Sequence, residues 1–272
     1  MSAGACNACP AHLQMAKMGV KVEDCDHVVA LAGNPNTGKS SIFNALTGLR
    51  QHVGNWAGKT VTRAEGAFSF GGARYKLVDL PGTYSLLSSS QDEEISRNFL
   101  LFGQPDCTVV VVDATALERN LNLVLQVLEI TDKVVVCVNL MDEAERKGLE
   151  VDVRSLARDL GVPAVPTVAR SKIGLAELVS SVASVVSGET ATAPRRVAPS
   201  PAVQSAIESL VPLLREAVPG LPSERWVALR LLDGDERVRE ALVSGELAGL
   251  ASHQRQPAPL RSSRITAIAG AQ

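Results

Sequence analysis

The sequence predicts an α/β domain with a mostly parallel sheet flanked by helices, followed by a small all-α domain. Three observations support this prediction. Strand-like apolar runs alternate with helical patterns along residues 27–188, which is typical of a parallel sheet covered by helices. Two of these runs, 108–113 and 133–139, are almost wholly apolar, as strands buried on both faces must be. Beyond a stretch rich in Ala, Thr, Pro and Arg at 188–201, only helical patterns follow.

The elements of the α/β part follow one another along the chain. Apolar runs predict the strands, and apolar side chains at helical spacing predict the helices, as between Leu121 and Leu128. The pair Gly71-Gly72 between two such runs indicates a hairpin. The expected strands are 28–32, 66–70, 74–80, 108–113, 133–139 and 164–168. The expected helices are 41–47, 121–129, 152–160 and 175–186.

Breaks in composition mark the remaining boundaries. The helices expected in the all-α part are 201–217, 225–232 and 235–245. From about Pro257 onward, the mixture of Pro, Ser and Arg predicts a disordered or artificial tail. The expected parts are a Cys-containing N-terminal extension (1–26), the α/β domain (27–188), a linker (189–200), a helical domain (201–250) and a disordered tail (251–272).

Composition excludes several classes of protein. The 272 residues carry a net charge of -2 and only 3% aromatic residues, so no nucleic-acid partner is expected. No apolar stretch reaches the ~18 residues of a membrane span, and the N-terminus lacks a secretory pattern. We therefore expect a soluble, cytosolic chain. Cys107 and Cys137 lie in apolar runs and are expected to be buried thiols.

The segment 33–40, GNPNTGKS, has the Gly-x4-Gly-Lys-Ser spacing of a phosphate-binding loop between a strand and a helix. Glycines let the backbone turn its N–H groups toward phosphates, and the helix adds its positive end. Lys39 would reach the β- and γ-phosphates, and the Ser40 hydroxyl would ligate Mg²⁺. This spacing predicts a nucleoside triphosphate site. Its residues are Gly33, Asn34, Pro35, Asn36, Thr37, Gly38, Lys39, Ser40 and Ser41.

A second motif, NLMD at 139–142, favours guanine over adenine. It follows strand 133–139, at the sheet edge where ligands of open α/β sheets bind. The ionised Asp142 carboxylate only accepts hydrogen bonds, so it suits the two N–H donors of guanine, which adenine does not match. An ordinary strand-end loop is the alternative. A backbone N–H after strand 164–168 would contact the guanine O6, although Ala and Arg are common after strands. The residues of these two segments are Asn139, Leu140, Met141, Asp142, Val168, Ala169 and Arg170.

Two further segments are expected around the phosphates. Asp79, at the end of strand 74–80, would hold Mg²⁺ through water, and the Gly82 N–H would sense the γ-phosphate. Thr60, in a loop over 51–62, would close over Mg²⁺ when GTP is present. The serine-rich segment 83–91 would be a second mobile loop. The strand-end segment consists of Asp79, Leu80, Pro81 and Gly82.

The ordered motifs resemble small GTPases of the TrmE–Era–septin type, and finer strings resemble the family of FeoB, the bacterial ferrous iron transport protein B. The resemblance covers about 26–249 and implies a P-loop GTPase fold that hydrolyses GTP to GDP and phosphate. RWVALRLL at 225–232 is similar to the helical domain that follows the G domain in that family. The other matching strings are GNPN at 33–36, QHVGNWAGKTVTR at 51–63, DLPGTYSL at 79–86, VDA at 112–114, LERNL at 117–121 and NLMDEA at 139–144.

The resemblance implies potassium activation. Thr83 follows Gly82, where Ras-like enzymes carry the glutamine that orients the attacking water, so hydrolysis must rely on another group. In the family, K⁺ stands near the place of an arginine finger, where it would neutralise developing charge. The matching ligands here are the Asn36 side chain and backbone carbonyls in the segment from Gly54 to Trp56; the alternative is that Asn36 only stabilises the turn. The residues expected to act in hydrolysis are Asn36, Lys39, Thr60 and Gly82.

In the family, this part precedes a polytopic membrane domain that moves Fe²⁺. The resemblance therefore implies a soluble module that regulates ferrous iron uptake at the cytoplasmic face of the bacterial inner membrane. It implies GTP or GDP, Mg²⁺ and K⁺ as cofactors and the membrane domain as partner, with small Feo accessory proteins and a homo-oligomer as further candidates. The rival interpretation is a free-standing regulatory GTPase not linked to transport, for which a basic or aromatic RNA-binding appendage would be expected.

Cysteines near the N-terminus form a candidate Zn²⁺ or iron site. Cys6 and Cys9 have the Cys-x2-Cys spacing of half a zinc or iron–sulfur site, and Cys25 lies further along with His12 and His27. No second pair follows, so two alternatives stay open: a reduced, flexible terminus, or a helix over 11–18 with incidental thiols. A role of the extension as an iron sensor or scaffold would depend on this cluster.

Overall fold

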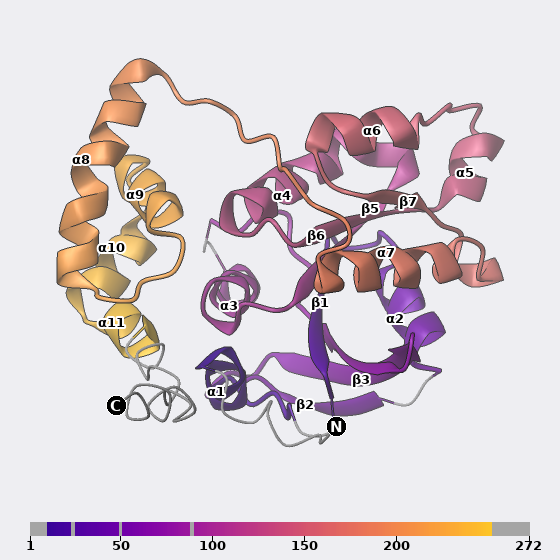
Figure 1. The fold of residues 1–272 in the computed structure, drawn as a ribbon, viewed down its shortest axis with the longest axis horizontal. Helices are drawn as coiled ribbons and strands as arrows, with labels where there is room; N and C mark the ends of the chain where they lie inside the picture. The colour runs from indigo at the N-terminus through magenta and orange to yellow at the C-terminus, as the bar shows by residue number, and fades with distance from the viewer. Residues whose placement is uncertain (1–9, 23–24, 49–50, 88–89, 252–272) are drawn as a thin grey trace, which may run out of the picture.

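The computed structural model describes residues 10–22, 25–48, 51–87 and 90–251. The described chain folds around a seven-stranded sheet in the order β2-β3-β4-β1-β5-β6-β7 (Figure 1). Pairs from β4 through β1, β5 and β6 to β7 are parallel, and the β2-β3-β4 pairs are antiparallel. The strands are β1 His27–Gly33, β2 Gln51–Asn55, β3 Thr62–Phe70, β4 Ala73–Asp79, β5 Cys107–Asp113, β6 Val134–Asn139 and β7 Ala164–Pro166.

Helices cover both faces of the sheet and continue past it. One face packs on α2 and α7, whose buried residues include Ile42 and Leu178; the other packs on α3 and α4 through residues such as Leu123. The α-helices are α1 Pro10–Lys17, α2 Lys39–Thr47, α3 Gln91–Asn98, α4 Leu117–Ile130, α5 Met141–Arg146, α6 Val153–Leu160, α7 Leu175–Ser187, α8 Pro201–Ala217, α9 Glu224–Leu232, α10 Glu236–Val243 and α11 Glu246–Ala251. Shorter helical segments are η2 Phe99–Gly103, η3 Ala114–Ala116 and η4 Ala169–Ser171.

Four local expectations need correction. The loop expected over 51–62 begins with β2, an edge strand whose residues 52–55 are half-buried or exposed, so it has no apolar alternation to reveal it. The expected mobile loop 83–91 ends in α3, where Ser90 accepts a hydrogen bond from the Glu93 N–H. The strand expected over 164–168 ends at Pro166. The helix expected over 235–245 ends at Val243, and a further helix that was not expected, α11, begins after Gly245, whose φ is +79°.

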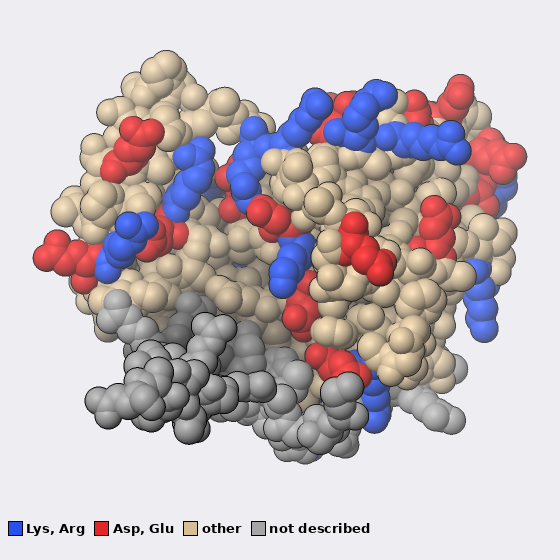
Figure 2. Space-filling view, viewed as in Figure 1, with Lys and Arg blue, Asp and Glu red and all other residues tan. Residues whose placement is uncertain are grey.

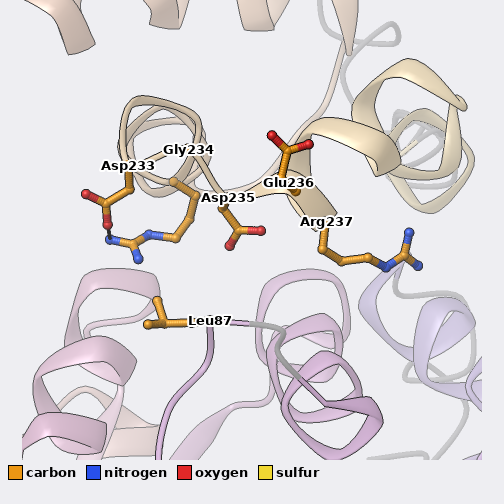
Figure 3. A pocket seen from close by; sticks show the side chains of 7 residues that line it. Leu87, Asp233, Gly234, Asp235, Glu236 and Arg237 are labelled. Atoms are coloured by element: carbon orange, nitrogen blue, oxygen red, sulfur yellow. Dashed lines mark ion pairs between the residues drawn. The ribbon is translucent and has the colours of Figure 1, made fainter.

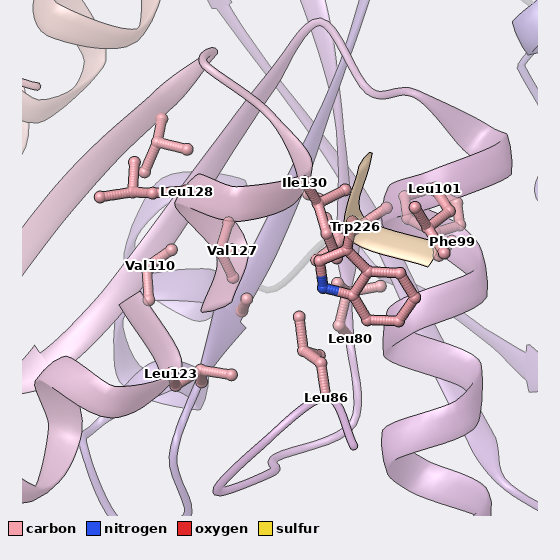
Figure 4. Packing of buried hydrophobic residues seen from close by; sticks show 14 of the residues in the cluster. Leu80, Leu86, Phe99, Leu101, Val110, Leu123, Val127, Leu128, Ile130 and Trp226 are labelled. Carbon is pink, nitrogen blue, oxygen red and sulfur yellow. The ribbon is translucent and has the colours of Figure 1, made fainter. Parts of the chain in front are cut away.

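The C-terminal helices α8–α11 stand beside the sheet and share its apolar core (Figure 1). Trp226 of α9 is 4% exposed and lies among Ile130, Leu101 and Phe99 (Figure 4). The Ser223 hydroxyl donates to the carbonyl oxygen of Ile130 at 2.9 Å. A single hydrophobic cluster therefore connects α4, η2 and α9. Among the described residues, no helix is long and apolar enough to cross a membrane.

Both signs of charge are interspersed on the face shown in Figure 2. At the junction between the sheet and the C-terminal helices, Leu87 faces the turn between α9 and α10 across a cavity of about 340 Å³ (Figure 3). Arg230 and Asp233 form an ion pair of 3.0 Å at this turn. The junction thus combines an apolar core with a charged rim.

Candidate nucleotide-binding site

The candidate site lies where the parallel strands end. The segments after β1, β4, β6 and β7 leave the same edge of the sheet because these strands run in parallel. Open α/β sheets bind ligands at this carboxyl edge. The fold therefore brings the phosphate loop, Asp79 and the 139–142 motif to one edge.

The phosphate loop turns tightly between β1 and α2. Gly38 has a φ of +80°, and a Cβ atom there would lie 2.3 Å from the Asn139 Nδ2, so only glycine fits. Inside the loop, the Thr37 hydroxyl donates to the Asn34 carbonyl oxygen at 2.9 Å. Gly38 gives α2 no side-chain cap. The first N–H groups of α2 can therefore bind an anion, as a phosphate-binding loop requires.

Lys39 lies between the phosphate loop and β4. Its ammonium group forms a short ion pair with Asp79 and donates to the Leu80 carbonyl oxygen at 2.8 Å. The two charged side chains are only 11% and 20% exposed. Burial raises the pKa of Asp79 above its ordinary value, and the charge of Lys39 opposes this shift. The structure thus brings together the two predicted residues that a phosphate and a divalent cation would need.

Asn139 joins three loops of the site. Its Nδ2 donates to the Thr37 carbonyl oxygen at 3.0 Å, which ties the end of β6 to the phosphate loop. Its Oδ1 accepts hydrogen bonds from the Ala169 N–H at 3.1 Å and from the Thr167 hydroxyl at 3.3 Å. Sequence reasoning placed Asn139 in the base-recognition motif but missed this joining role and missed Thr167. A strand-end Asn gave no signal of its partners.

Asp142 and Asn34 have unused polar atoms. Leu140, whose φ is +64°, immediately precedes α5. Asp142 lies in the first turn of this helix. The Asp142 Oδ1 is buried and has no hydrogen-bond partner among the described residues, while Oδ2 lies 3.5 Å from an Arg146 nitrogen. Both polar side-chain atoms of Asn34 are likewise buried without a partner in the described structure. Buried polar atoms normally have partners, so these atoms keep hydrogen-bonding capacity that a ligand could use.

The second segment expected to contact the base, 168–170, is more constrained than predicted. The Val168 N–H donates to the Ile173 carbonyl oxygen at 3.1 Å, and the Ala169 N–H donates to Asn139. Both donors are therefore already used. Arg170 is exposed within η4 beside them.

The residues expected around the γ-phosphate lie in two different settings. Gly82 lies against the phosphate loop, because a Cβ built on it would be 3.6 Å from the Pro35 nitrogen. The next residue, Thr83, donates its N–H to the Gly33 carbonyl oxygen at 3.3 Å. Thr60 is exposed in the loop between β2 and β3. Ser40 is also exposed, at the start of α2.

The predicted N-terminal metal site lies largely outside the described residues. Cys6 and Cys9 are not described, nor is the His12 side chain. The Cys25 thiol donates to the Val22 carbonyl oxygen at 3.2 Å. In the described part of the chain, no group of three His, Cys, Asp or Glu side chains could hold a metal ion. The cysteine site therefore stays a prediction.

The sheet, the phosphate loop and the motif at the end of β6 define the class: a P-loop G domain. The family of ferrous iron transport protein B matches residues 27–182, and the FeoB cytosolic helical domain matches residues 200–259. The chain belongs to the ferrous iron transport protein B family.

Curated relatives support the same family. The Fe(2+) transporter FeoB of Escherichia coli (strain K12) is 39% identical over 211 residues, which cover 76% of this chain and 27% of the transporter. A Porphyromonas gingivalis Fe(2+) transport protein A/Fe(2+) transporter FeoB fusion protein is 40% identical over 225 residues, covering 80% and 27%. The matched region thus spans about a quarter of the length of these relatives.

Solved structures of cytosolic FeoB domains have the same fold. The apo form from T. maritima has a TM-score of 0.73 and 37% identity, covering 84% of this chain and 92% of that one. A T. maritima form with GDP has a TM-score of 0.73 and 36% identity, covering 84% and 93%. A form with GMPPNP has a TM-score of 0.72 and 35% identity, covering 88% and 90%.

Proposed function

We propose that this chain binds guanine nucleotides and hydrolyses GTP to GDP and phosphate. The observation that carries the proposal is the hydrogen bond from Asn139 to Thr37, because it fixes the base-recognition motif against the phosphate loop. The buried, unpartnered oxygen of Asp142 supports guanine, whose edge offers two donors to a carboxylate. The GDP and GMPPNP forms of similar cytosolic domains support nucleotide binding in the same fold.

In the proposed complex, Lys39 exchanges its present partners for phosphate oxygens. Its ion pair with Asp79 keeps the ammonium group at the mouth of the loop, and a phosphate would replace the carboxylate as its partner. The hydrogen bond to the Leu80 carbonyl oxygen would likewise be given up for a phosphate oxygen. The N–H of Arg170 is the candidate donor to the guanine O6, since the N–H groups of Val168 and Ala169 are already engaged within the described structure.

Ser40, Asp79 and Thr60 are the proposed holders of Mg²⁺. Hydroxyl and carboxylate oxygens are the donors this ion prefers, so the residue types fit. Asp79 already lies beside the phosphate-binding Lys39, which supports its place near the bridging oxygens. When bound, Mg²⁺ would neutralise charge on the β- and γ-phosphates. Thr60 would have to move with its loop, because its side chain is exposed in the present structure.

Asn36 is the proposed side-chain ligand of K⁺. Its φ is +66°, and the residue is exposed in the phosphate loop. With the backbone carbonyls of Gly54 and Trp56, an amide oxygen would suit a monovalent cation. When bound, K⁺ would supply positive charge between the β- and γ-phosphates. The absence of a glutamine at Thr83 supports a need for such charge.

The proposed biological setting is a soluble module on the cytoplasmic face of the bacterial inner membrane, attached to the membrane domain of a ferrous iron transporter. Membership of the family supports this setting, and the Fe(2+) transporter relatives are longer than the matched region. The nucleotide state would then regulate iron uptake. Small Feo accessory proteins and further copies of the chain stay candidate partners.

Titration calorimetry with GDP and with GMPPNP in the presence of Mg²⁺ tests the proposal. We expect saturable heat for both, and none for the matching adenine nucleotides. Asp142→Asn should weaken GDP binding by 100-fold or more, on the order of 3 kcal/mol, because the acceptor for the guanine N–H donors is lost. Xanthine has a carbonyl in place of the guanine amino group, so the same variant should gain affinity for xanthosine diphosphate. Equal GDP affinity in both proteins would contradict guanine recognition by Asp142.

A further inference from the structure

The N-terminal segment 10–22 is built into the fold although it precedes the family match, which begins at residue 27. Its helix α1 lies between the β2–β3 region and the C-terminal helix α11 (Figure 1). Met15 and Val20 are each 1% exposed and belong to the main hydrophobic cluster. The segment therefore packs as part of the G domain and not as a loose extension.

Arg63 connects this segment to the base of the β2–β3 loop. It is 5% exposed, and its guanidinium donates to the carbonyl oxygens of Met18 at 3.2 Å, Asn55 at 2.7 Å and Gly19. Its Nε donates to Glu65 at 2.7 Å, which fixes the orientation of the side chain. One buried cation thus holds the turn after α1 and the end of β2 together.

The loop itself is anchored beside Arg63. Trp56 is 3% exposed. Its ring centroid lies 5.5 Å from that of Phe99, in an edge-to-face arrangement. The Arg63 guanidinium carbon lies over the same Trp56 ring, 5.5 Å from its centroid. The Ala57 N–H donates to the Met18 carbonyl oxygen at 3.4 Å. Lys59, next to the proposed Mg²⁺ ligand Thr60, pairs with Glu94 of α3 at 3.4 Å. The loop is therefore docked onto α1 and α3.

The same segment also contacts the C-terminal helices. The Gln14 side chain, 1% exposed, donates to the Leu250 carbonyl oxygen of α11. A cavity of about 280 Å³, lined by Lys17, Trp56 and Glu94 among others, lies where α1, the loop, α3 and α11 meet. The segment 10–22 is thus hydrogen-bonded to Arg63, while the cavity leaves space beside the 56–61 loop into which the loop could move.

We propose that residues 10–22 are an intramolecular clamp that holds the 56–61 loop in an open position and opposes its closure over bound GTP. The proposal rests on the proposed GTPase function, because closure means bringing Thr60 to the nucleotide. Closure would break the Met18 contact with the loop and disturb the Arg63 and Trp56 packing. Because the loop must lose these contacts when it closes, the free energy of the contacts favours the open position of the loop.

Gly19→Ala is the variant that tests the clamp. Gly19 has a φ of +88°, and a Cβ there would lie 2.5 Å from the Arg63 Nη1, so alanine must displace the guanidinium. Gly188→Ala is the matched control: its φ is +79°, but a Cβ would meet nothing within 4 Å. Both variants carry backbone strain, and only the first disturbs the clamp.

Two measurements on the full chain distinguish the outcomes. By calorimetry, we expect Gly19→Ala to raise the GMPPNP affinity relative to the GDP affinity by about 5-fold, because only the triphosphate rewards closure. Without nucleotide, acrylamide should quench Trp56 more strongly in Gly19→Ala than in Gly188→Ala, both read in a Trp226→Phe background that removes the other tryptophan. Gln14→Met keeps the side-chain volume but removes the hydrogen bond from α1 to Leu250 of α11, which should loosen the packing of α1. It serves as a second variant if Gly19→Ala does not fold.

The clamp is overturned if wild-type protein binds both nucleotides while Gly19→Ala and Gln14→Met match Gly188→Ala in the affinity ratio and in quenching. Failure of the wild-type protein to bind either nucleotide would instead reject the proposed GTPase function. The quenching comparison needs no nucleotide, so it tests the contact between the segment and the loop in either case.

Discussion

At the scale of single residues, Asn36 has the clearest catalytic expectation. Asn36→Ala should keep nucleotide affinity and lose the stimulation of GTP hydrolysis by K⁺ over Na⁺, which we expect to be about 10-fold or more in the wild-type protein. The reason is that its exposed amide oxygen is the proposed K⁺ ligand. Phosphate release measured in matched KCl and NaCl buffers checks this. Asn122→Ala, on the exposed side of α4, should respond like wild type; a K⁺ response surviving in Asn36→Ala would exclude this ligand.

Single residues also show what sequence can predict. The GNPNTGKS segment was predictable because its chemistry depends on neighbours within eight positions. The link from Asn139 to Thr37 was not, since its partners are 102 residues apart. The same holds for Arg63, whose contacts with Met18 and Gly19 depend on how α1 docks. Spacing rules describe local backbone geometry and carry no information about such distant pairs.

At the scale of elements, apolar strands such as β5 and β6 were predictable because burial on both faces requires a continuous apolar run. The edge strand β2 was not, because it is held by pairing with β3 and not by an apolar face. Helix α3 was also missed, although Ser90 followed by three acidic residues is a helix start. The expected serine-rich loop over 83–91 reaches only the first residue of α3, and no element was expected from the following residues.

Helix α3 makes a charged contact with the C-terminal helices through Glu94. Burial alone would raise the pKa of Glu94, but the hydrogen bond from Arg237 and the charge of Lys59 outweigh it and lower the pKa below its ordinary value of 4.5. A lowered pKa in the folded state gives stability that is present above pH 4.5 and lost as the pH falls through the folded-state value. Glu94→Gln should therefore cost about 1 kcal/mol at pH 7 and progressively less at acid pH.

Denaturant unfolding at several pH values from 7 downward measures this dependence. Glu236→Gln is the control, because Glu236 forms an ion pair with Arg239 in which both side chains are more than 60% exposed. Exposed pairs contribute little, so this control should be nearly neutral at all pH values. If the loss of unfolding free energy in Glu94→Gln stayed constant as the pH fell below 4.5, the ionised carboxylate would not be the source of that stability.

At the scale of the whole molecule, an apolar cluster joins α9 to the sheet, so we expect the described chain to unfold as one cooperative unit. Trp226→Ala should destabilise the protein by about 3–5 kcal/mol, because it removes a large side chain packed among Ile130, Leu101 and Phe99 (Figure 4). Wild type should unfold in one calorimetric transition, since α8–α11 share a core with the sheet. The variant should show a lower-temperature transition for these helices.

Leu213→Ala, at a side chain 61% exposed on α8, is the control and should change stability by less than about 0.5 kcal/mol. A Trp226→Ala midpoint equal to that of Leu213→Ala would show that the two parts fold independently of this contact.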